Sequence, residues 1–208
     1  MKNNYNLIAP FYDSIVAFVF GKAIYKAQIE LFDQLPEEGN ALFIGGGSGK
    51  VLKVLVERRP QLKITYLEKS KNMLALSRKK VTDAQQINFI LGGLNDIPHK
   101  PYDAILTFFF LDLFEAKERQ EVFDQLKSQL KTKGFWLIAD FLPPKKRKYR
   151  MIESLMFAFL KVSTKIASHR IDKFQKYFTN QEFELLQEKK YYDNFIFSAI
   201  YQKLRNDS

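Results

Sequence analysis

Short apolar runs alternate with amphipathic stretches along the chain from residue 41 onward. The runs that read as buried strands cover residues 41–44, 62–67, 87–91, 102–109 and 135–139. After the first run, apolar residues such as Val51, Leu52 and Leu55 return at helical spacing. This alternation predicts βαβ units, in which a parallel sheet carries helices on both faces.

Helical patterns extend over residues 10–34, 72–80, 116–130 and roughly 147–178. At the end of the chain, two runs rich in β-forming residues, 183–192 and 195–201, flank Asp193-Asn194, which predicts a short hairpin turn. Strands joined so tightly must be antiparallel. The expected fold is α/β: a three-layer, Rossmann-like, doubly wound sheet of seven strands, mostly parallel with an antiparallel C-terminal hairpin strand.

Length and composition indicate one globular domain. The 208 residues are 46% hydrophobic and 27% charged, which is an ordinary composition for a folded chain. We expect a single domain over residues 1–208, with an N-terminal helical cap at 1–34 and a helical lid insertion at 142–178. No signal peptide and no bilayer-spanning apolar run is predicted, so a cytoplasmic location is expected.

The residue types exclude several kinds of chemistry. The absence of cysteine rules out disulfides, thiolate metal sites and cysteine nucleophiles. Two histidines, His99 and His169, leave little scope for a histidine-based metal centre. No metal is therefore expected.

The chain is strongly basic, with a formal net charge of +10. This charge indicates an anionic partner, such as nucleic acid, lipid headgroups or an acidic metabolite, or it serves solubility alone. An apolar helical face begins at Met151, directly after the densest basic cluster. The combination predicts either a peripheral membrane contact or a lid helix packed on the domain. The cluster consists of Lys145, Lys146, Arg147, Lys148 and Arg150.

A glycine-rich loop, Gly45-Gly46-Gly47-Ser48-Gly49, lies between the first strand and the following helix. Glycines permit positive φ and close approach of a ligand, and the helix N-terminus favours a carboxylate or phosphate. Glu68 ends the next strand, where an acid accepts hydrogen bonds from two ribose hydroxyls. Together they predict an adenosine-containing cofactor. The dinucleotide spacing would require a glycine at Lys50, which disfavours a nicotinamide-dependent reductase.

The segment Phe43–Gly49, followed by Glu68, resembles the cofactor motifs of class I S-adenosylmethionine (SAM)-dependent methyltransferases. The segments 90–98, 102–106 and 131–140 are similar to the family's adenine loop, fourth strand, and turn with fifth strand. Tyr5–Asp13 is similar to the N-terminal segment of quinone-biosynthesis and related small-molecule methyltransferases. The resemblance implies a SAM-dependent enzyme that transfers a methyl group to a small acceptor, apolar or lipid-like.

The resemblance also implies which residues hold SAM. Two positions depart from the family pattern, which usually carries an acid at Phe43 and an aspartate at Gly93 for the adenine amino group. Backbone groups of Leu94 or the side chain of Asn95 are then expected to hold adenine. The full set of expected cofactor residues is Gly45, Gly46, Gly47, Gly49, Glu68, Lys69, Gly93, Leu94, Asn95 and Tyr12.

Candidate proton acceptors lie near the strand ends. Asp112 and Asp140 follow the fourth and fifth strands, where open α/β sheets bind their ligands. His169 has an unperturbed pKa of about 6.5 and suits proton transfer at neutral pH. Each also has a structural interpretation, as a helix cap for Asp112 and as a surface residue for His169.

Two aromatic features have both a functional and a structural interpretation. Tyr177 is a candidate for orienting an acceptor or a core residue. Phe108 and Phe110 are expected on one face of the fourth strand, with Phe109 on the other.

Two alternative functions remain open. The net charge suggests a nucleic-acid methyltransferase, and the departures at Phe43 and Gly93 suggest a non-catalytic SAM-binding protein.

Overall fold

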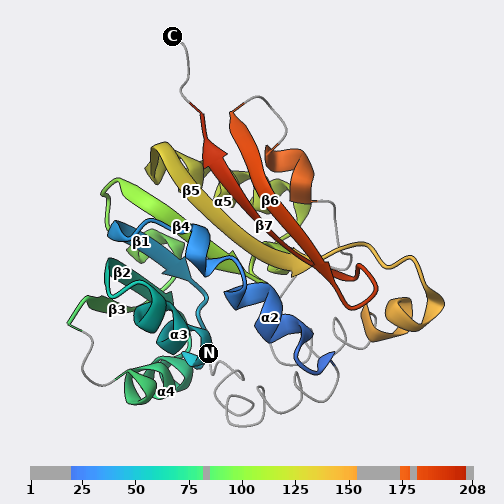
Figure 1. Ribbon diagram of the computed structural model, residues 1–208, viewed down its shortest axis with the longest axis horizontal. Helices are drawn as coiled ribbons and strands as arrows, with labels where there is room; N and C mark the ends of the chain where they lie inside the picture. The colour runs from blue at the N-terminus through green and yellow to red at the C-terminus, as the bar shows by residue number, and fades with distance from the viewer. Residues whose placement is uncertain (1–19, 82–84, 154–173, 179–181, 205–208) are drawn as a thin grey trace.

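The structure is a computed structural model that describes residues 20–81, 85–153, 174–178 and 182–204. Its centre is one seven-stranded sheet with strand order β3-β2-β1-β4-β5-β7-β6 (Figure 1). Strand β7 is antiparallel to both of its neighbours, and all other pairs are parallel. The predicted fold class is therefore confirmed. The strands are β1 Glu38–Ile44, β2 Gln61–Glu68, β3 Ile87–Leu91, β4 Tyr102–Phe108, β5 Leu130–Phe141, β6 Phe183–Tyr191 and β7 Ile196–Lys203.

Helices cover both faces of the sheet, as Figure 1 shows. Helices α2 and α3 pack on one face and α5 on the other. The α-helices are α2 Ala23–Ile29, α3 Lys50–Arg58, α4 Lys71–Lys80 and α5 Ala116–Gln129. The short 3₁₀ helices are η1 Phe32–Gln34, η2 Leu94–Asp96, η3 Leu111–Leu113 and η4 Phe174–Phe178. Residues 147–153 are also helical.

The strand periodicity divides the core into two layers. On β1, Ala41 and Phe43 contribute to the layer under α2 and α3. The alternate residues Leu42 and Ile44 contribute to the layer under α5. All four are at most 2% exposed, because parallel strands are covered on both faces and lack a solvated side. This explains why the strands read as unbroken apolar runs.

Most predicted boundaries agree with the structure within three residues, but β5 is longer than expected. It begins at Leu130 rather than at residue 135, and its pairing with β4 shifts register between Tyr102 and Ala104. Lys133 lies within this extension with a φ of 62°. The prediction failed because this part of the strand is irregular and carries polar residues, of which Thr132 and Lys133 are exposed, so no alternating apolar pattern marks it.

The hairpin between β6 and β7 also differs from the prediction. The strands end at Tyr191 and resume at Ile196, so the connection is longer than Asp193-Asn194. Tyr192, Asp193 and Asn194 all have positive φ, between 52° and 64°. Three consecutive left-handed residues are an unusual turn solution for side chains other than glycine, and the sequence therefore indicated a shorter one.

The predicted helix over 10–34 is interrupted in its described part. A turn at Gly21 and another at residues 30–31 separate α2 from its neighbours. Of the predicted helix over 147–178, residues 147–153 are helical and 174–178 form η4. The rest lies outside the described residues, so the cap at 1–34 and the lid at 142–178 stay predictions. Within the described ranges, no helix has the length and apolarity to cross a membrane.

Candidate functional site

The carboxyl ends of β1, β2 and β3 bring three loops into direct contact. The amide of Gly45 donates to the carbonyl of Leu67 at 2.9 Å, which joins the glycine loop to the end of β2. The amide of Gly92 donates to the carbonyl of Glu68 at 3.1 Å, which joins the third loop to the same point. The sequence motifs at these three strand ends therefore form one site.

The glycine loop needs glycine for conformation at three positions. Gly45, Gly47 and Gly49 have φ values of 64°, 65° and 79°, in the left-handed region. Gly49 precedes α3 and also packs closely on α4, because a Cβ there would lie 2.5 Å from the Cα of Ser77. At Gly47 and Gly93, by contrast, a Cβ would meet no atom of the described residues within 4 Å. The surface beside these two glycines is therefore open to a ligand.

Glu68 holds the loop through its side chain. Its Oε2 accepts the amide of Gly47 at 2.9 Å, and its Oε1 accepts the amide of Ser70 at 2.7 Å. Burial raises the pKa of the Glu68 carboxyl, while hydrogen bonds from Ser70, Gly47 and Lys69 oppose the rise. A carboxylate offers about four acceptor positions, so the group retains capacity for further donors.

Tyr66 is a site residue that the sequence analysis missed. It is fully buried behind the glycine loop, and its hydroxyl donates to the carbonyl of Gly47 at 2.9 Å. A Cβ on Gly46 would lie 2.5 Å from that hydroxyl oxygen and closer still to the ring. Gly46 is therefore required for space, and Tyr66 shapes the loop from behind.

Phe43 packs against Tyr66 and belongs to the core. The two rings meet edge to face at 5.3 Å, and Phe43 meets Phe108 in the same way at the same distance. An acid at this position would be buried between aromatic rings at high energetic cost. The phenylalanine at position 43, where the family usually has an acid, is thus part of an aromatic layer beneath the glycine loop.

The third loop is ordered by two side chains. Asp96 accepts the amide of Gly93 at 2.8 Å, and Gln125 of α5 donates to the carbonyl of Leu94 at 3.1 Å. Asn95 is exposed at this loop, and Lys69 is exposed next to Glu68. The Gly93 amide and the Leu94 carbonyl already have partners within the chain. Leu94 and Asn95 both stay predictions for the adenine contact.

Two buried carboxylates follow β4 and end β5. Asp112 and Asp140 are 2% and 0% exposed, and Asp112 Oδ1 and Asp140 Oδ2 have no hydrogen-bond partner among the described residues. Burial raises the pKa of Asp112 to about 7. Burial raises the pKa of Asp140 well above its usual value, and the neighbouring Asp112 raises it further. Burial therefore favours the protonated form of both carboxyls.

Arg119 of α5 lies beside this pair, fully buried. Its Nε donates to the carbonyl of Leu111 at 2.8 Å, and its Nη2 donates to the carbonyl of Phe114. Its charge lowers the pKa of Asp112 and of Asp140, against the larger effect of burial. Arg119 thereby fixes the segment that carries Asp112 and supplies a compensating charge.

Phe109 marks a sharp change of direction at the end of β4. Its φ is 50°, a strained value for a bulky residue, and its amide donates to the carbonyl of Ala139. The expected alternation is consequently wrong: Phe108 and Phe109 pack with one core layer, whereas Phe110 packs with the other. Phe110 instead lies against the glycine loop, 3.1 Å from where a Cβ on Gly45 would be.

Three further residues were expected at this edge. Tyr12 and His169 lie outside the described residues. Tyr177 packs against Phe123 of α5 with ring centroids 5.4 Å apart, so it is a core residue. The part of the chain that the structure describes contains no group of three or more His, Cys, Asp or Glu side chains suited to a metal ion.

Aromatic rings cluster beyond the end of β5. Phe141 contacts Phe20, Phe109 and Phe195, with ring centroids 4.8 to 5.4 Å apart. Tyr192 joins the cluster through Phe20 at 5.5 Å. These rings are buried in the core layer under α2 and α3, so the cluster belongs to the core at the carboxyl end of β5.

The sequence matches a known family model over residues 41–134, described as a methyltransferase domain. A demethylmenaquinone methyltransferase from Thermotoga maritima is 29% identical over 150 residues, which are 70% of this chain and 63% of that protein. The chain thus spans less than two thirds of the length of this curated relative.

Several solved structures with a similar fold are described as methyltransferases. An O-methyltransferase family 2 protein from Planctomyces limnophilus, in complex with apigenin, has a TM-score of 0.69 and 15% identity, covering 94% of this chain and 62% of its own. CalO1, a methyltransferase in calicheamicin biosynthesis solved in its SAH-bound form, has a TM-score of 0.64 and 17% identity, covering 92% and 56%. At sequence identities this low, the similarity to these two structures shows a shared fold and nothing more.

Proposed function

We propose that the chain binds SAM and transfers its methyl group to a small apolar acceptor, on the premise of its match to a methyltransferase domain model over residues 41–134 and of the fold that it shares with solved methyltransferases. The observation that carries the proposal is the contact between Glu68 and the glycine loop at 2.9 Å. This contact brings the backbone of the glycine loop and the Glu68 carboxylate together at the carboxyl ends of β1 and β2, which is the arrangement that binds an adenosine in this type of sheet.

The residues of this edge fit the cofactor. Open space beside Gly47 and Gly93 leaves room for a ligand along both loops. Glu68 has acceptor capacity for a ribose hydroxyl beyond the amides that it already binds. We expect the N-terminus of α3, which begins at Lys50, to bind the carboxylate of the methionine moiety, because the first amides of a helix have no partner within the helix. Asn95 is our candidate for the adenine contact.

SAM supplies a methyl group on a positively charged sulfur, so the protein contributes chiefly by alignment. An oxygen or carbon acceptor also has to lose a proton. Asp112 and Asp140 are our candidates for that role, because Asp112 follows β4 and Asp140 lies at the end of β5, at the edge where open α/β sheets bind their ligands. Arg119 would balance the charge that remains on the pair.

The acceptor class rests on one observation. The relative from Thermotoga maritima is named for a quinone substrate, which is an apolar ring system.

The test is methyl transfer from SAM labelled in its methyl group. The chain is incubated with a panel of phenols, quinols and catechols, and in parallel with total RNA, and labelled products are separated by solvent extraction. The proposal expects label in an organic-extractable product that depends on the chain. Label only in RNA would overturn the proposed acceptor class, and binding of SAM without transfer to any acceptor would favour a non-catalytic SAM-binding protein.

A further inference from the structure

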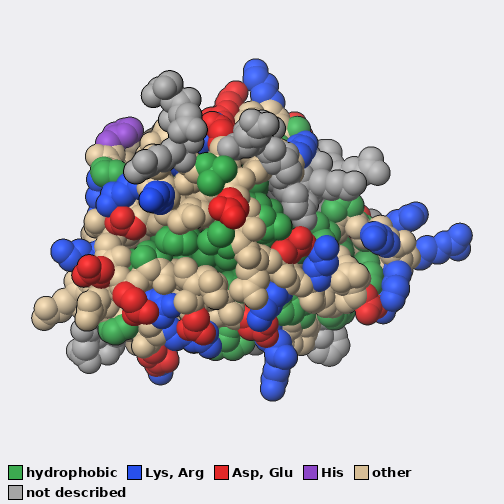
Figure 2. Space-filling model, turned by 45° about the horizontal axis from the view of Figure 1, so that its top comes forward, with side chains coloured by type: hydrophobic (Ala, Val, Ile, Leu, Met, Phe, Trp, Pro, Cys, Tyr) green, Lys and Arg blue, Asp and Glu red, His purple; other side chains and the backbone are tan. Residues whose placement is uncertain are grey.

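A strongly basic segment follows β5 at the site end of the sheet. Its charged side chains are all exposed, and Met151, which follows them directly, is 63% exposed. Figure 2 shows Lys and Arg side chains projecting outward from one end of the molecule. We call this segment the basic surface, and its residues are Lys145, Lys146, Arg147, Lys148, Arg150 and Met151.

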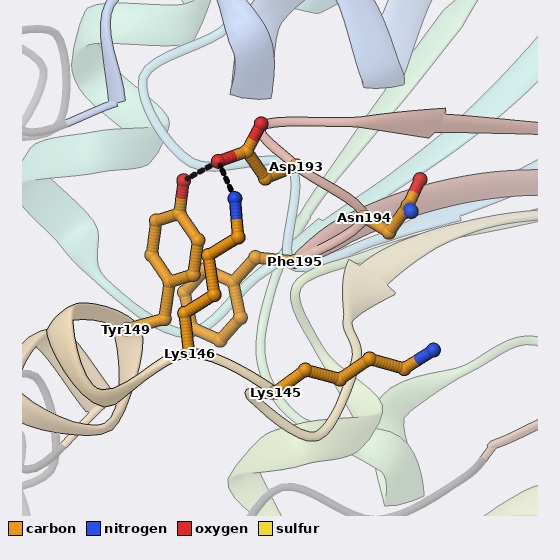
Figure 3. A pocket seen from close by; sticks show the side chains of 6 residues that line it. All are labelled: Lys145, Lys146, Tyr149, Asp193, Asn194 and Phe195. Atoms are coloured by element: carbon orange, nitrogen blue, oxygen red, sulfur yellow. Dashed lines mark hydrogen bonds and ion pairs between the residues drawn. The ribbon is translucent and has the colours of Figure 1, made fainter.

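Tyr149 fixes the basic surface to the turn between β6 and β7. It is 4% exposed, its ring stacks on Phe195 at 5.2 Å, and its hydroxyl donates to Asp193 at 2.8 Å. Lys146 also donates to Asp193 at 2.8 Å, and Figure 3 shows both bonds converging on one carboxylate oxygen. The attachment holds the cations in a defined place relative to the sheet.

The local charge remains clearly positive after pairing. Asp193 is shared by Lys146 and Lys148, at 2.8 and 3.4 Å. Five cations against two nearby carboxylates, Asp193 and Glu153, leave a surplus of three positive charges. These exposed pairs contribute little to stability, so most of the charge is available to an anionic partner.

We propose that the basic surface docks the chain on an anionic lipid bilayer, with Met151 entering the interface. Cations beside an exposed apolar side chain suit a charged headgroup layer above acyl chains better than they suit a nucleic-acid backbone. The aromatic cluster around Phe141 and Phe195 adjoins this surface through Tyr149. Docking would therefore bring the site end of the sheet close to a bilayer, where apolar molecules partition.

The experiment is sedimentation of the full chain with large vesicles of phosphatidylcholine, alone or with 30% phosphatidylglycerol, at low and high salt. The proposal expects binding only to the anionic vesicles, weakened by salt. Each basic residue near such a surface changes partitioning about fivefold, so Lys145→Gln with Arg147→Gln should lower it roughly 25-fold. Met151→Gln should weaken it further at constant charge.

The control removes two exposed lysines elsewhere, Lys79→Gln with Lys117→Gln, and should change partitioning less than about threefold. Equal binding to both vesicle types, no binding to either, or equal losses in the two double variants would overturn the proposal. Binding to RNA in place of vesicles, lost in Lys145→Gln with Arg147→Gln, would assign the surface to nucleic acid. Calorimetry with SAM on the same variants separates this outcome from a failure of the proposed function, because docking does not depend on cofactor binding.

Discussion

Replacing Gly46 with alanine tests the contact between the glycine loop and Tyr66. Gly46 is not among the positive-φ residues, so alanine fits its backbone. The added methyl group, however, would overlap the Tyr66 ring and lie 2.5 Å from its hydroxyl oxygen. The ring is fully buried between Phe43 and Phe89 and has no room to move aside. The loop itself must therefore shift.

The expected destabilisation has two parts. Overpacking a tight core costs about 1–3 kcal/mol. Displacing the loop also removes the hydrogen bond from Tyr66 to Gly47, which contributes about 1 kcal/mol. We expect Gly46→Ala to lower the free energy of unfolding by roughly 2–4 kcal/mol in urea titrations, and to weaken SAM binding because the loop moves.

Gly93→Ala is the matched control, because its φ is −117° and its Cβ would meet nothing within 4 Å. It should change the free energy of unfolding by less than about 0.5 kcal/mol. In a Tyr66→Leu background, which lacks the distal ring atoms, the cost of Gly46→Ala should fall below about 1 kcal/mol. Equal effects of the two alanine variants, or an unchanged cost in the Tyr66→Leu background, would refute the reasoning.

Two further substitutions probe charge and backbone. Burial raises the pKa of Asp112 to about 7. Between pH 4 and 7 the folded chain therefore keeps a proton on this carboxyl that the unfolded chain releases. The free energy of unfolding should consequently fall as the pH rises through this range. Asp112→Asn should flatten this fall in urea titrations at pH 5 and 8, and an unchanged slope would contradict the assignment. Lys133→Gly removes the strain of a φ of 62° at an exposed position, so it should raise the free energy of unfolding by about 0.5 kcal/mol in the same urea titrations. A lower free energy of unfolding in this variant would show that the position is unstrained.

The sequence was sufficient for the parts of the site that depend on chain order. Gly45–Gly49 and Glu68 follow neighbouring parallel strands, and the carboxyl ends of such strands meet at one edge. Their contact could thus be expected before the structure, and the structure has it at 2.9 Å. The seven-stranded fold followed from the same alternation of strands and helices.

The sequence did not predict the residues whose burial or backbone conformation differs from what their residue type usually indicates. Arg119 stands among charged and polar neighbours on α5, yet it is buried and binds two carbonyls. Tyr66 looks like any strand residue, and its fit to Gly46 depends on a contact between different elements. Phe109 takes a left-handed φ that its bulk disfavours. Such features arise from tertiary packing and leave no local pattern.

Calorimetry with SAM on the chain and on Glu68→Gln tests the central claim most directly. Glutamine keeps the size of the side chain but removes the charge and one acceptor oxygen, which should weaken binding at least about tenfold. Glu57→Gln, an exposed acid on α3, should bind SAM as the unmodified chain does. A chain that gives no binding heat with SAM, or a Glu68→Gln variant that binds as tightly as Glu57→Gln, would contradict the assignment of this strand edge to the cofactor.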